Sequence, residues 1–402
     1  MNRLTSIGGQ LALAYGKSLP AQLRVTGTVP VFGSNGIVGY HEEKCVSGPG
    51  IIVGRKGSVG EVLYCEGDFW PIDTTYYVVN SKGHQWRYLF YMLKHAGLTK
   101  LNSHSAVPGL NREDAYATEA WFPDEKNQQK VAAILDQITA SIDLEMTALK
   151  NVSLIKNTTM KDLFTRGLRG EAQKETEIGL VPESWDVHRL VAHHMVVSGG
   201  TPSRGNPVFW TGGTIPWAKT TEVNYCVISQ TEEHITPAGL SGSAAKLLPV
   251  GTLLLAMYGQ GVTRGRVAIL GIEAACNQAC AAIKPKDDAV ASKYLYHYLT
   301  WRYEAIRELA HGGQQQNLNL DIVRDLQIAY PTDPDEQQGI IEILDAIDKK
   351  IALHQQKKLV LDELFRSLLD KLMTGEISVE DLDLSALTHE EPQPQTEAEV
   401  QS

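Results

Sequence analysis

Two stretches of the sequence repeat one apolar pattern: QQKVAAILDQITASI at residues 128–142 and QQGIIEILDAIDKKI at residues 337–351. The second copy follows the first by 209 residues, and no residue is gained or lost between them. Apolar residues recur at steps of four and three, which is the spacing of a coiled-coil seam. The predicted seam residues are Val131, Leu135, Ile138, Ile142, Leu344, Ile347, Ile351, Leu361, Phe365 and Leu368.

Each of the two predicted helices extends for roughly 40 residues, or on the order of 60 Å at 1.5 Å per residue. Such a length favours a spacer over an element of a globular core. The alternative is a pair of ordinary amphipathic helices in a core. Glu145 and His354 occupy matching polar positions in the two seams, where polar residues can fix the register of a coiled coil.

Upstream of each long helix lies a similar succession of a helical segment, a loop and a Pro-terminated segment, preceded by short β-type runs bounded by glycine. The sequence therefore predicts a pseudo-twofold internal repeat of α/β (α+β) domains and long helices that form an antiparallel coiled coil. The predicted boundaries are a first domain at 1–124, a helix at 125–170, a second domain at 171–334, a helix at 335–375, and an acidic tail at 376–402 that we expect to be disordered. Residues 167–179 are predicted to be a polar linker.

The acidic charge is concentrated at the end of the chain. The net charge is −10, and residues 376–402 carry eight acidic side chains and no Lys or Arg, which leaves −2 for residues 1–375. The remainder can therefore carry local basic patches. The sequence contains no apolar run long enough for a membrane span, and we expect no signal peptide. Five cysteines without CxxC spacing predict reduced thiols and a cytoplasmic location, and Cys276 with Cys280 lacks partners for zinc.

Motifs for catalysis are missing. The sequence has no Asn/Asp-Pro-Pro-Tyr/Phe motif of an amino-methyltransferase and no GxxxxGK[ST] loop of an ATPase. GQGVTRG at residues 259–265 is interpreted as a strand turn, because it opens no convincing βαβ unit. His104, His193 and His194 are interpreted as ordinary loop or surface histidines. We therefore predict no catalytic residue and no metal site in this chain.

The opening of the second half carries a family resemblance. It reads IGLVPESWDVHRL at residues 178–190 and SGGTPSRGNPVFWTGGTIPW at residues 198–217, while the first half carries GKSL at 16–19 and VPVFGSNGIVGY at 29–40. Together with the two long helices, these segments resemble the specificity (S) subunits of Type I restriction–modification systems. The likeness covers about residues 4–375. The first half departs from the pattern because it lacks the Pro-Glu-x-Trp lead-in.

The resemblance implies a fold of two target recognition domains held apart by an antiparallel helix pair. It implies a non-catalytic DNA-specificity subunit that recognises a bipartite duplex site and takes part in defence against foreign DNA. Two methyltransferase (M) subunits would dock on the helices and methylate adenine with S-adenosylmethionine. Restriction (R) subunits would translocate and cleave unmodified DNA with ATP and Mg. None of these cofactors is expected on this chain.

In the first domain, DNA contacts are expected from two turns. Hydroxyl, amide and basic side chains supply the hydrogen bonds that reach phosphates and base edges. The turn FGSNG is equally consistent with an ordinary hairpin. The candidates are Ser34, Asn35, Arg55, Lys56 and Ser58.

In the second domain, the predicted contacts lie in loops and on a strand-turn-strand segment equivalent to residues 55–59. Trp210 and Trp217 are predicted to pack the domain. The glutamine run at 314–316 is equally consistent with a solvated loop. The candidates are Thr201, Ser203, Arg204, Lys219, Tyr258, Gln260, Thr263, Arg264, Arg266, Asn277, Gln278, Gln315 and Asn317.

Two other classes of function stay open at this point. One is a coiled-coil scaffold whose globular domains bind protein partners in a defence complex, which the acidic total favours slightly. The other is an autonomous methyltransferase or nuclease, which the missing motifs disfavour. Duplex DNA that fails to compete for the domains at low salt would favour the scaffold.

Overall fold

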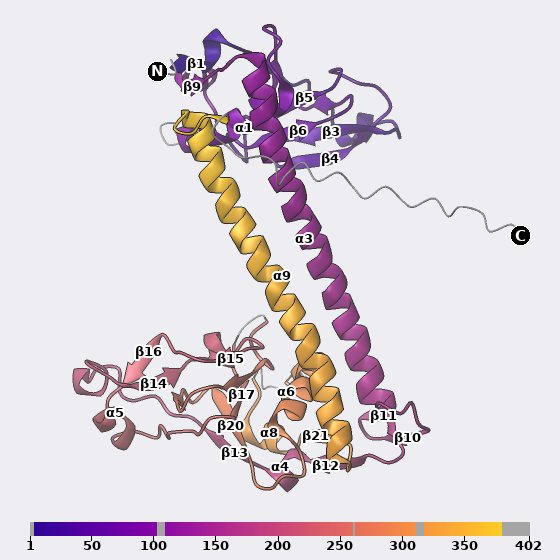
Figure 1. Cartoon of the computed structure of the whole chain (residues 1–402), viewed down its shortest axis with the longest axis vertical. Coiled ribbons are helices and arrows are strands. Elements are labelled where there is room, and N and C mark those ends of the chain that lie inside the picture. The colour runs from indigo at the N-terminus through magenta and orange to yellow at the C-terminus, as the bar shows by residue number, and fades with distance from the viewer. Residues whose placement is uncertain (1–3, 103–108, 260–261, 311–316, 380–402) are drawn as a thin grey trace, which may run out of the picture. The chain divides into compact units, whose positions relative to one another are not determined.

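The computed structural model describes residues 4–102, 109–259, 262–310 and 317–379. It divides into two compact units, Met1–Thr147 with Gln355–Ser402 and Ala148–His354. Each unit contains a globular part, which we call its head, and a section of two long helices, α3 (Glu125–Arg166) and α9 (Pro334–Thr374) (Figure 1). The first head comprises residues 4–121 and the second head residues 171–330.

The first head contains two sheets, with strand orders β2-β8-β5-β6 and β4-β3-β7, and the separate strand pair β1-β9. Its strands are β1 (Leu4–Ser6), β2 (Ala12–Tyr15), β3 (Val29–Gly33), β4 (Gly36–His41), β5 (Gly50–Gly54), β6 (Val62–Cys65), β7 (Trp70–Pro71), β8 (Thr75–Val79) and β9 (Glu119–Trp121). Its α-helices are α1 (Trp86–His95) and α2 (Arg112–Ala117), and its 3-10 helices are Ile7–Gly9, Ala21–Leu23 and Leu98–Asn102.

The second head contains sheets of order β13-β20-β17-β18-β15 and β16-β14-β19, with the strand pairs β12-β21 and β10-β11. Its strands are β10 (Gln173–Thr176), β11 (Gly179–Pro182), β12 (Asp186–Arg189), β13 (His194–Ser198), β14 (Ile215–Ala218), β15 (Val227–Ile228), β16 (Glu233–Ile235), β17 (Leu253–Ala256), β18 (Val267–Leu270), β19 (Ala275–Cys276), β20 (Cys280–Pro285) and β21 (Gln327–Tyr330). Its helices are α4 (Leu190–His193), α5 (Pro237–Ser241), α6 (Ser292–Trp301), α7 (Tyr303–Glu308) and α8 (Leu320–Arg324), with 3-10 turns at Pro207–Phe209 and Thr220–Glu222.

Apart from β15, which adds a fifth strand to the larger sheet of the second head, the two heads share one sheet topology, and this confirms the internal repeat. The order β2-β8-β5-β6 recurs as β13-β20-β17-β18, and β4-β3-β7 recurs as β16-β14-β19. In each smaller sheet the first pair of strands is antiparallel and the second is parallel. The predicted equivalence of the two strand-turn-strand segments is confirmed, because β5-β6 and β17-β18 occupy the same places in the sheet order.

The central strands of the two larger sheets are apolar because both of their faces are covered. Every residue of β5 and of β17 is buried. Leu253 and Leu255 of β17 join the core that includes α3 and α9, while Leu254 and Ala256 join a second core on the other face. Alternating side chains point to opposite faces of a strand, so a strand covered on both sides shows a continuous apolar run.

The Pro-Glu-x-Trp segment anchors the second head to its long helices. Trp185 is fully buried in the core that contains Phe164 of α3, and its ring lies 6.1 Å from that of Tyr294 on α6. Just before it, residues 173–182 form the hairpin β10-β11, with Gly179 in the left-handed region at φ 105°. Part of the predicted polar linker at 167–179 therefore forms a hairpin, because its alternating residues 173–176 pair with 179–182.

The long helices lie side by side within each unit (Figure 1). In the first unit, Lys357 Nζ lies 3.7 Å from Glu145 Oε1. In the second, Lys156 Nζ donates to Asp348 Oδ1 at 2.5 Å, and the backbone amide of Leu168 donates to Glu336 Oε1 at 3.0 Å. Residue numbers rise on one helix as they fall on the other, so the helices are antiparallel.

The predicted seam residues are shielded from solvent. Each of its ten side chains is buried or half-buried, and none is exposed. Glu145 and His354 are also half-buried in this seam. Glycines in the left-handed region follow both helices, Gly167 at φ 65° and Gly375 at φ 70°, and such residues commonly terminate helices.

Each head is fixed to a long helix by a polar contact of a half-buried aspartate at the same place in the repeat. In the first unit, Asp136 of α3 accepts from Arg87 Nε at 2.7 Å and from the Tyr91 hydroxyl at 2.6 Å, both on α1. In the second, Asp345 of α9 contacts Lys293 Nζ at 2.5 Å and His297 Nε2 at 2.9 Å, both on α6. We call these contacts the first and second clamps.

Candidate nucleic-acid interface

Three loops meet at one end of the larger sheet in the first head. They are the segment that begins at Gly16, the turn that begins at Arg55, and the turn at residues 72–74. The amide of Lys17 donates to the carbonyl of Pro71 at 2.9 Å. The amides of Arg55 and Lys56 both donate to the carbonyl of Thr74, at 2.9 and 3.0 Å. The loops are therefore held to one another by their backbones.

Close backbone approach requires a glycine at the first of these loops. A Cβ atom on Gly16 would lie 2.1 Å from the carbonyl oxygen of Ile72. No side chain fits at that distance, so glycine is what allows the loop that contains Lys17 and Ser18 to pass over the turn at 72–74. Both Lys17 and Ser18 are exposed.

Arg55 stabilises the cluster through contacts of its guanidinium group. Its guanidinium donates to the carbonyl of Asp73 through Nε at 3.2 Å and Nη2 at 2.6 Å. It also lies over the rings of Tyr15 and Tyr76, at 5.2 and 5.9 Å from their centres. Arg55 is half-buried, whereas the next residue, Lys56, is exposed. That these two residues contact DNA stays a prediction. Of the two cations, Lys56 is the more exposed to solvent.

The predicted hairpin at Ser34 and Asn35 joins the same cluster. β3 and β4 meet at this turn, and Gly36 has a φ of 120°. A Cβ atom on Gly57 would lie 3.1 Å from the Ser34 hydroxyl oxygen, so the hairpin tip is next to the turn after Arg55. Asn35 is exposed and Ser58 half-buried. The structure brings together all five residues predicted for the first domain.

The second head repeats this backbone wiring. A Cβ atom on Gly199 would lie 2.2 Å from the carbonyl oxygen of Cys276, and the amide of Gly200 donates to the same carbonyl at 2.9 Å. The amide of Met257 donates to the carbonyl of Ala279 at 2.8 Å. These bonds match those of Gly16, Lys17 and Arg55 in the first head, so Gly199, Gly200 and Met257 are their counterparts.

A tryptophan supports the crossing loop in both heads. The indole of Trp70 donates to the carbonyl of Lys17 at 2.8 Å, and that of Trp217 donates to the carbonyl of Gly200 at 2.9 Å. The two tryptophans come from different strands, β7 and β14. Trp217 is buried and Trp210 half-buried, with their rings 5.2 Å apart, which confirms the prediction that they pack the domain.

The turn at 277–279 lies beside Thr201. The Thr201 hydroxyl donates to the side-chain oxygen of Gln278, and the amide of Asn277 donates to the carbonyl of Ala218 at 3.0 Å. Gln278 is exposed and Asn277 is half-buried. Three predicted residues of the second domain are thus adjacent, in the place that residues 18, 72 and 73 occupy in the first head.

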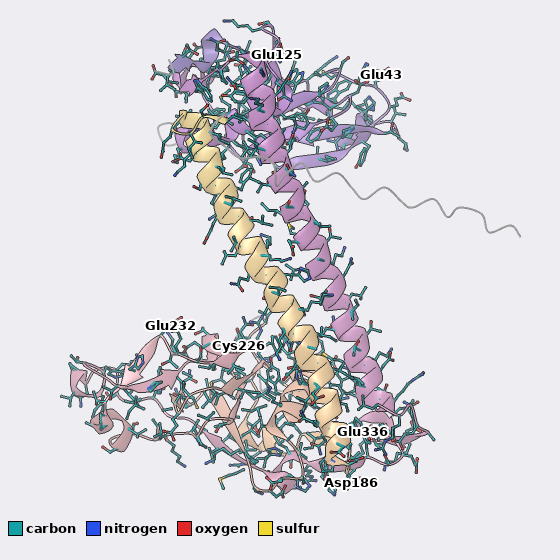
Figure 2. The ribbon with its side chains drawn as sticks, viewed as in Figure 1. Glu43, Glu125, Asp186, Cys226, Glu232 and Glu336 are labelled. Carbon is teal, nitrogen blue, oxygen red and sulfur yellow. The ribbon has the colours of Figure 1, made fainter. Side chains whose placement is uncertain are left out.

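Two predicted cations of the second head are paired with carboxylates. Arg204 forms an ion pair with Glu233, and its guanidinium lies 3.8 Å from the ring centre of Trp210. Lys219 Nζ lies 2.6 Å from Glu232 Oε2 and 3.2 Å from Glu233 Oε1. The hydrogen bond from Arg204 is the largest influence that lowers the pKa of Glu233. Figure 2 labels Glu232 within this head.

Most of the remaining predicted residues that the structure describes lie around the turn between β17 and β18. Tyr258 is exposed at its start, Thr263 and Arg264 are half-buried, and Arg266 donates to the side-chain oxygen of Asn224 at 2.7 Å. Asn317 is exposed beside Leu318, whose amide donates to the carbonyl of Met257 at 3.1 Å. Ser203 is exposed next to Arg204. Gln260 and Gln315 lie outside the described residues.

Comparison with known proteins decides the family. The profile of the family described as the Type I restriction modification DNA specificity domain matches residues 8–153 and 182–363. The chain belongs to this family. The two matched segments each take in most of one head and part of a long helix.

Individual relatives are more distant. The chain is 31% identical over 208 residues to the Type I restriction enzyme MjaIX specificity subunit of Methanocaldococcus jannaschii, a match that covers 50% of this chain and 47% of the relative. It is 27% identical over 226 residues to the EcoR124I/EcoR124II specificity subunit of Escherichia coli, with 55% and 52% covered. The chain therefore spans about half the length of these curated relatives.

The fold is also that of a solved family member. The crystal structure of a Type-I restriction-modification system S subunit from M. genitalium superposes with a TM-score of 0.66 at 15% identity, covering 92% of this chain and 96% of that one. At this identity the likeness establishes the fold alone.

Several polar residues of this specificity-domain fold escaped the sequence analysis. Lys17, Ser18 and Asp73 are exposed in the loop cluster of the first head, and none of them was among the predicted contacts. Gly-Lys-Ser at 16–18 and Gly-Gly-Thr at 199–201 are equivalent, but only the matched hydrogen bonds reveal it. Among residues 4–102, 109–259, 262–310 and 317–379, no group of three His, Cys, Asp or Glu side chains could hold a metal, and no helix could cross a membrane.

Proposed function

We propose that this chain is the DNA-specificity subunit of a Type I restriction–modification complex and that each head reads one half of a bipartite duplex site. The observation that carries the proposal is the loop cluster itself: one backbone wiring recurs in both heads but presents different side chains. A repeated scaffold with different polar loops suits two half-sites of unlike sequence.

The side chains of the clusters suit the groups that duplex DNA presents. Lys17 and Lys56 are exposed cations that can contact phosphates, and the hydroxyls of Ser18 and Thr201 can donate to phosphate or base oxygens. The amide of Gln278 matches the edge of an adenine in the major groove. The backbone bonds among the loops hold these groups in place before binding, which limits the entropy lost on association.

Exposed apolar side chains recur on the long helices at the repeat interval. Leu144 of α3 is 70% exposed, and Leu353, its counterpart on α9, is 53% exposed. Ile155 is 54% exposed, and its counterpart Leu364 is 43% exposed. Two equivalent apolar positions on each helix favour two copies of one partner, which we assign as methyltransferase (M) subunits.

Chemistry is assigned to the partners in this proposal. The M subunits use S-adenosylmethionine to methylate adenine, and restriction (R) subunits use ATP and Mg to act on unmodified DNA. This chain supplies the DNA sequence specificity and binds none of these cofactors. The complex works in the cytoplasm, where bacterial and archaeal DNA lies. The competing scaffold function draws support from the carboxylates that neutralise Arg204 and Lys219.

Mapping methylated adenines in the host genome, with and without this gene, tests the proposal. The expected result is one bipartite motif that disappears with the gene. Arg55→Ala should then relax or weaken only one half of that motif, and Arg264→Ala only the other. Equal loss at both halves for either variant contradicts the assignment. If the heads of the wild-type complex bind protein partners and show no preference for duplex DNA, that result favours the scaffold function.

A further inference from the structure

The position of Asp73 and Gln278 in the two loop clusters carries an inference that deepens the proposed function and rests on it. Asp73 comes directly after Ile72, whose carbonyl oxygen lies against Gly16 of the crossing loop. Gln278 comes two residues after Cys276, whose carbonyl oxygen lies against Gly199. The carbonyl of Pro71 accepts from Lys17, and that of Cys276 accepts from Gly200. Counting two residues on from each acceptor places Asp73 and Gln278 at the same point of the fold.

The neighbouring strands give the same register independently. The amide of Ile72 donates to the carbonyl of Phe32 at 2.9 Å, and the amide of Asn277 donates to the carbonyl of Ala218 at 3.0 Å. Phe32 pairs with Pro71 as Ala218 pairs with Cys276. Ile72 and Asn277 are therefore counterparts, and so are the residues that follow them.

The backbone of Asp73 is fixed while its side chain is exposed. The Asp73 carbonyl accepts two bonds from Arg55, and the carbonyl of the next residue accepts from the amides of Arg55 and Lys56. No hydrogen bond or ion pair of the Asp73 carboxylate occurs within the described residues. The exposed carboxylate is therefore carried by a turn whose backbone is held in place, in the same loop cluster as the exposed Lys17 and Lys56.

A carboxylate in this place needs a hydrogen-bond donor on the DNA. Phosphate groups are repelled by the Asp73 carboxylate but attracted by Arg55, Lys56 and Lys17. A duplex whose phosphates dock on these cations therefore brings its bases to the carboxylate. A carboxylate accepts from the N4 amino group of cytosine, while Gln pairs with adenine in the major groove. The side chain is acceptor-only when ionised, so it rejects base oxygens at that position.

We propose that Asp73 and Gln278 are equivalent specificity-determining residues, and that Asp73 accepts a hydrogen bond from the N4 amino group of a cytosine in the first half-site. Gln278 reads an adenine in the second half-site. The unlike side chains at this one position are then a direct source of the difference between the two half-sites.

The first experiment maps the methylated motif in a host that carries the complete complex with Asp73→Asn, Asp73→Ala or Gln278→Glu. Asp73 variants should relax one cytosine position in one half-site and leave the other half intact. Gln278→Glu should change one adenine position in the opposite half. Glu43→Gln is the matched control, because Glu43 is exposed beyond β4 at the opposite end of that strand from the hairpin tip (Figure 2).

The second experiment measures binding of the purified complex to duplexes that carry the mapped site. One duplex has the cytosine replaced by a 2-pyrimidinone nucleoside, which lacks the 4-amino group. The wild-type complex should bind this duplex about tenfold more weakly, in keeping with the value of a good base contact. Asp73→Ala should bind both duplexes with affinities that agree within about twofold.

Three outcomes overturn the inference: a motif that Asp73 substitutions leave unchanged, a first half-site without cytosine in either strand, or a tenfold preference for cytosine that persists in Asp73→Ala. The duplex comparison also decides the case in which a variant no longer methylates. If the wild-type complex recognises no bipartite site, the proposed function fails. If it does and Asp73 has no effect, only this inference fails.

Discussion

Asp136 and Asp345, separated by one repeat interval, hold the two heads to their long helices through different partners. Asp136 accepts from an arginine and a tyrosine of α1, and Asp345 contacts a lysine and a histidine of α6. The acceptor is the same in both units, but the first clamp pairs it with an arginine and a tyrosine and the second with a lysine and a histidine. The repeat has kept the contact while its chemistry has diverged.

Removing the first clamp should loosen α1. Asp136→Ala leaves Arg87 half-buried without its carboxylate, and a hydrogen bond to a charged group contributes about 1.5–3 kcal/mol. We expect the free energy of unfolding of the first unit to fall by about that amount and amide exchange in residues 86–95 to accelerate. Hydrogen exchange of the full chain measures it. Asp143→Ala, at an exposed position on the same helix, is the control, and equal exchange in both variants would contradict the clamp.

Acid should destabilise the second head through His194. Burial lowers the pKa of this histidine from 6.5 to about 4. Its folded pKa lies below its unfolded value, so the neutral ring contributes stability that is complete above pH 6.5 and is lost as the pH falls toward 4. This amounts to about 3 kcal/mol over the whole window.

His194→Leu should remove that part of the pH dependence. Urea unfolding of the full chain at pH 7, 6 and 5 should show a smaller decline for the variant than for the wild type. His234→Leu, at an exposed histidine of the same head, should decline like the wild type. Parallel pH curves for wild type and His194→Leu would rule out His194 as the source.

Lys56 should contribute to DNA affinity as a phosphate contact. Lys56→Ala should weaken binding to all duplexes to a similar degree and reduce the slope of log affinity against log salt by about 1. Titration of the purified complex between 50 and 200 mM salt tests this on the scale where such slopes are measured. Lys82→Ala provides the comparison, since Lys82 is exposed beyond the opposite end of β8, and a slope change of the same size there would contradict the assignment.

Gly199 should tolerate no side chain. Gly199→Ala places a Cβ atom 2.2 Å from the carbonyl oxygen of Cys276, so the crossing loop must move. We expect a loss of about 1–3 kcal/mol in stability, as for other overpacked sites, and weaker recognition of one half-site. Gly205→Ala in the same loop meets open space and should behave like the wild type. A Gly199→Ala variant with unchanged melting temperature and motif would show that the close approach is dispensable.

The long helices could be predicted from sequence because their signal is local and periodic. Ten seam positions follow from the spacing of apolar residues alone, and all ten are buried or half-buried. The predicted ends of the two helices are also close to the observed ends, because Gly167 and Gly375 follow the last helical turns. The hairpin β10-β11 was missed because its polar, alternating residues 173–182 look like a solvated linker.

The loop clusters could be predicted only in part, because their geometry depends on strand register. Arg55 seemed to correspond to the basic turn around Arg264, but its backbone counterpart is the buried Met257. Arg204 and Lys219 looked like free cations, yet both pair with carboxylates of Glu232 or Glu233, more than ten residues along the chain. Such pairings arise from sheet contacts that residue type and spacing do not reveal.

A strand near the start of each head is paired with the strand at its end: Leu4 of β1 lies opposite Trp121 of β9, and Asp186 of β12 lies opposite Tyr330 of β21. The chain of each head thus leaves and returns at one strand pair. A head from another protein with the same strand pair could replace it without altering the heptads of the long helices on either side. Exchange of whole heads by recombination would in this way create new DNA sequence specificities. It is a faster route than the accumulation of single base-contact mutations.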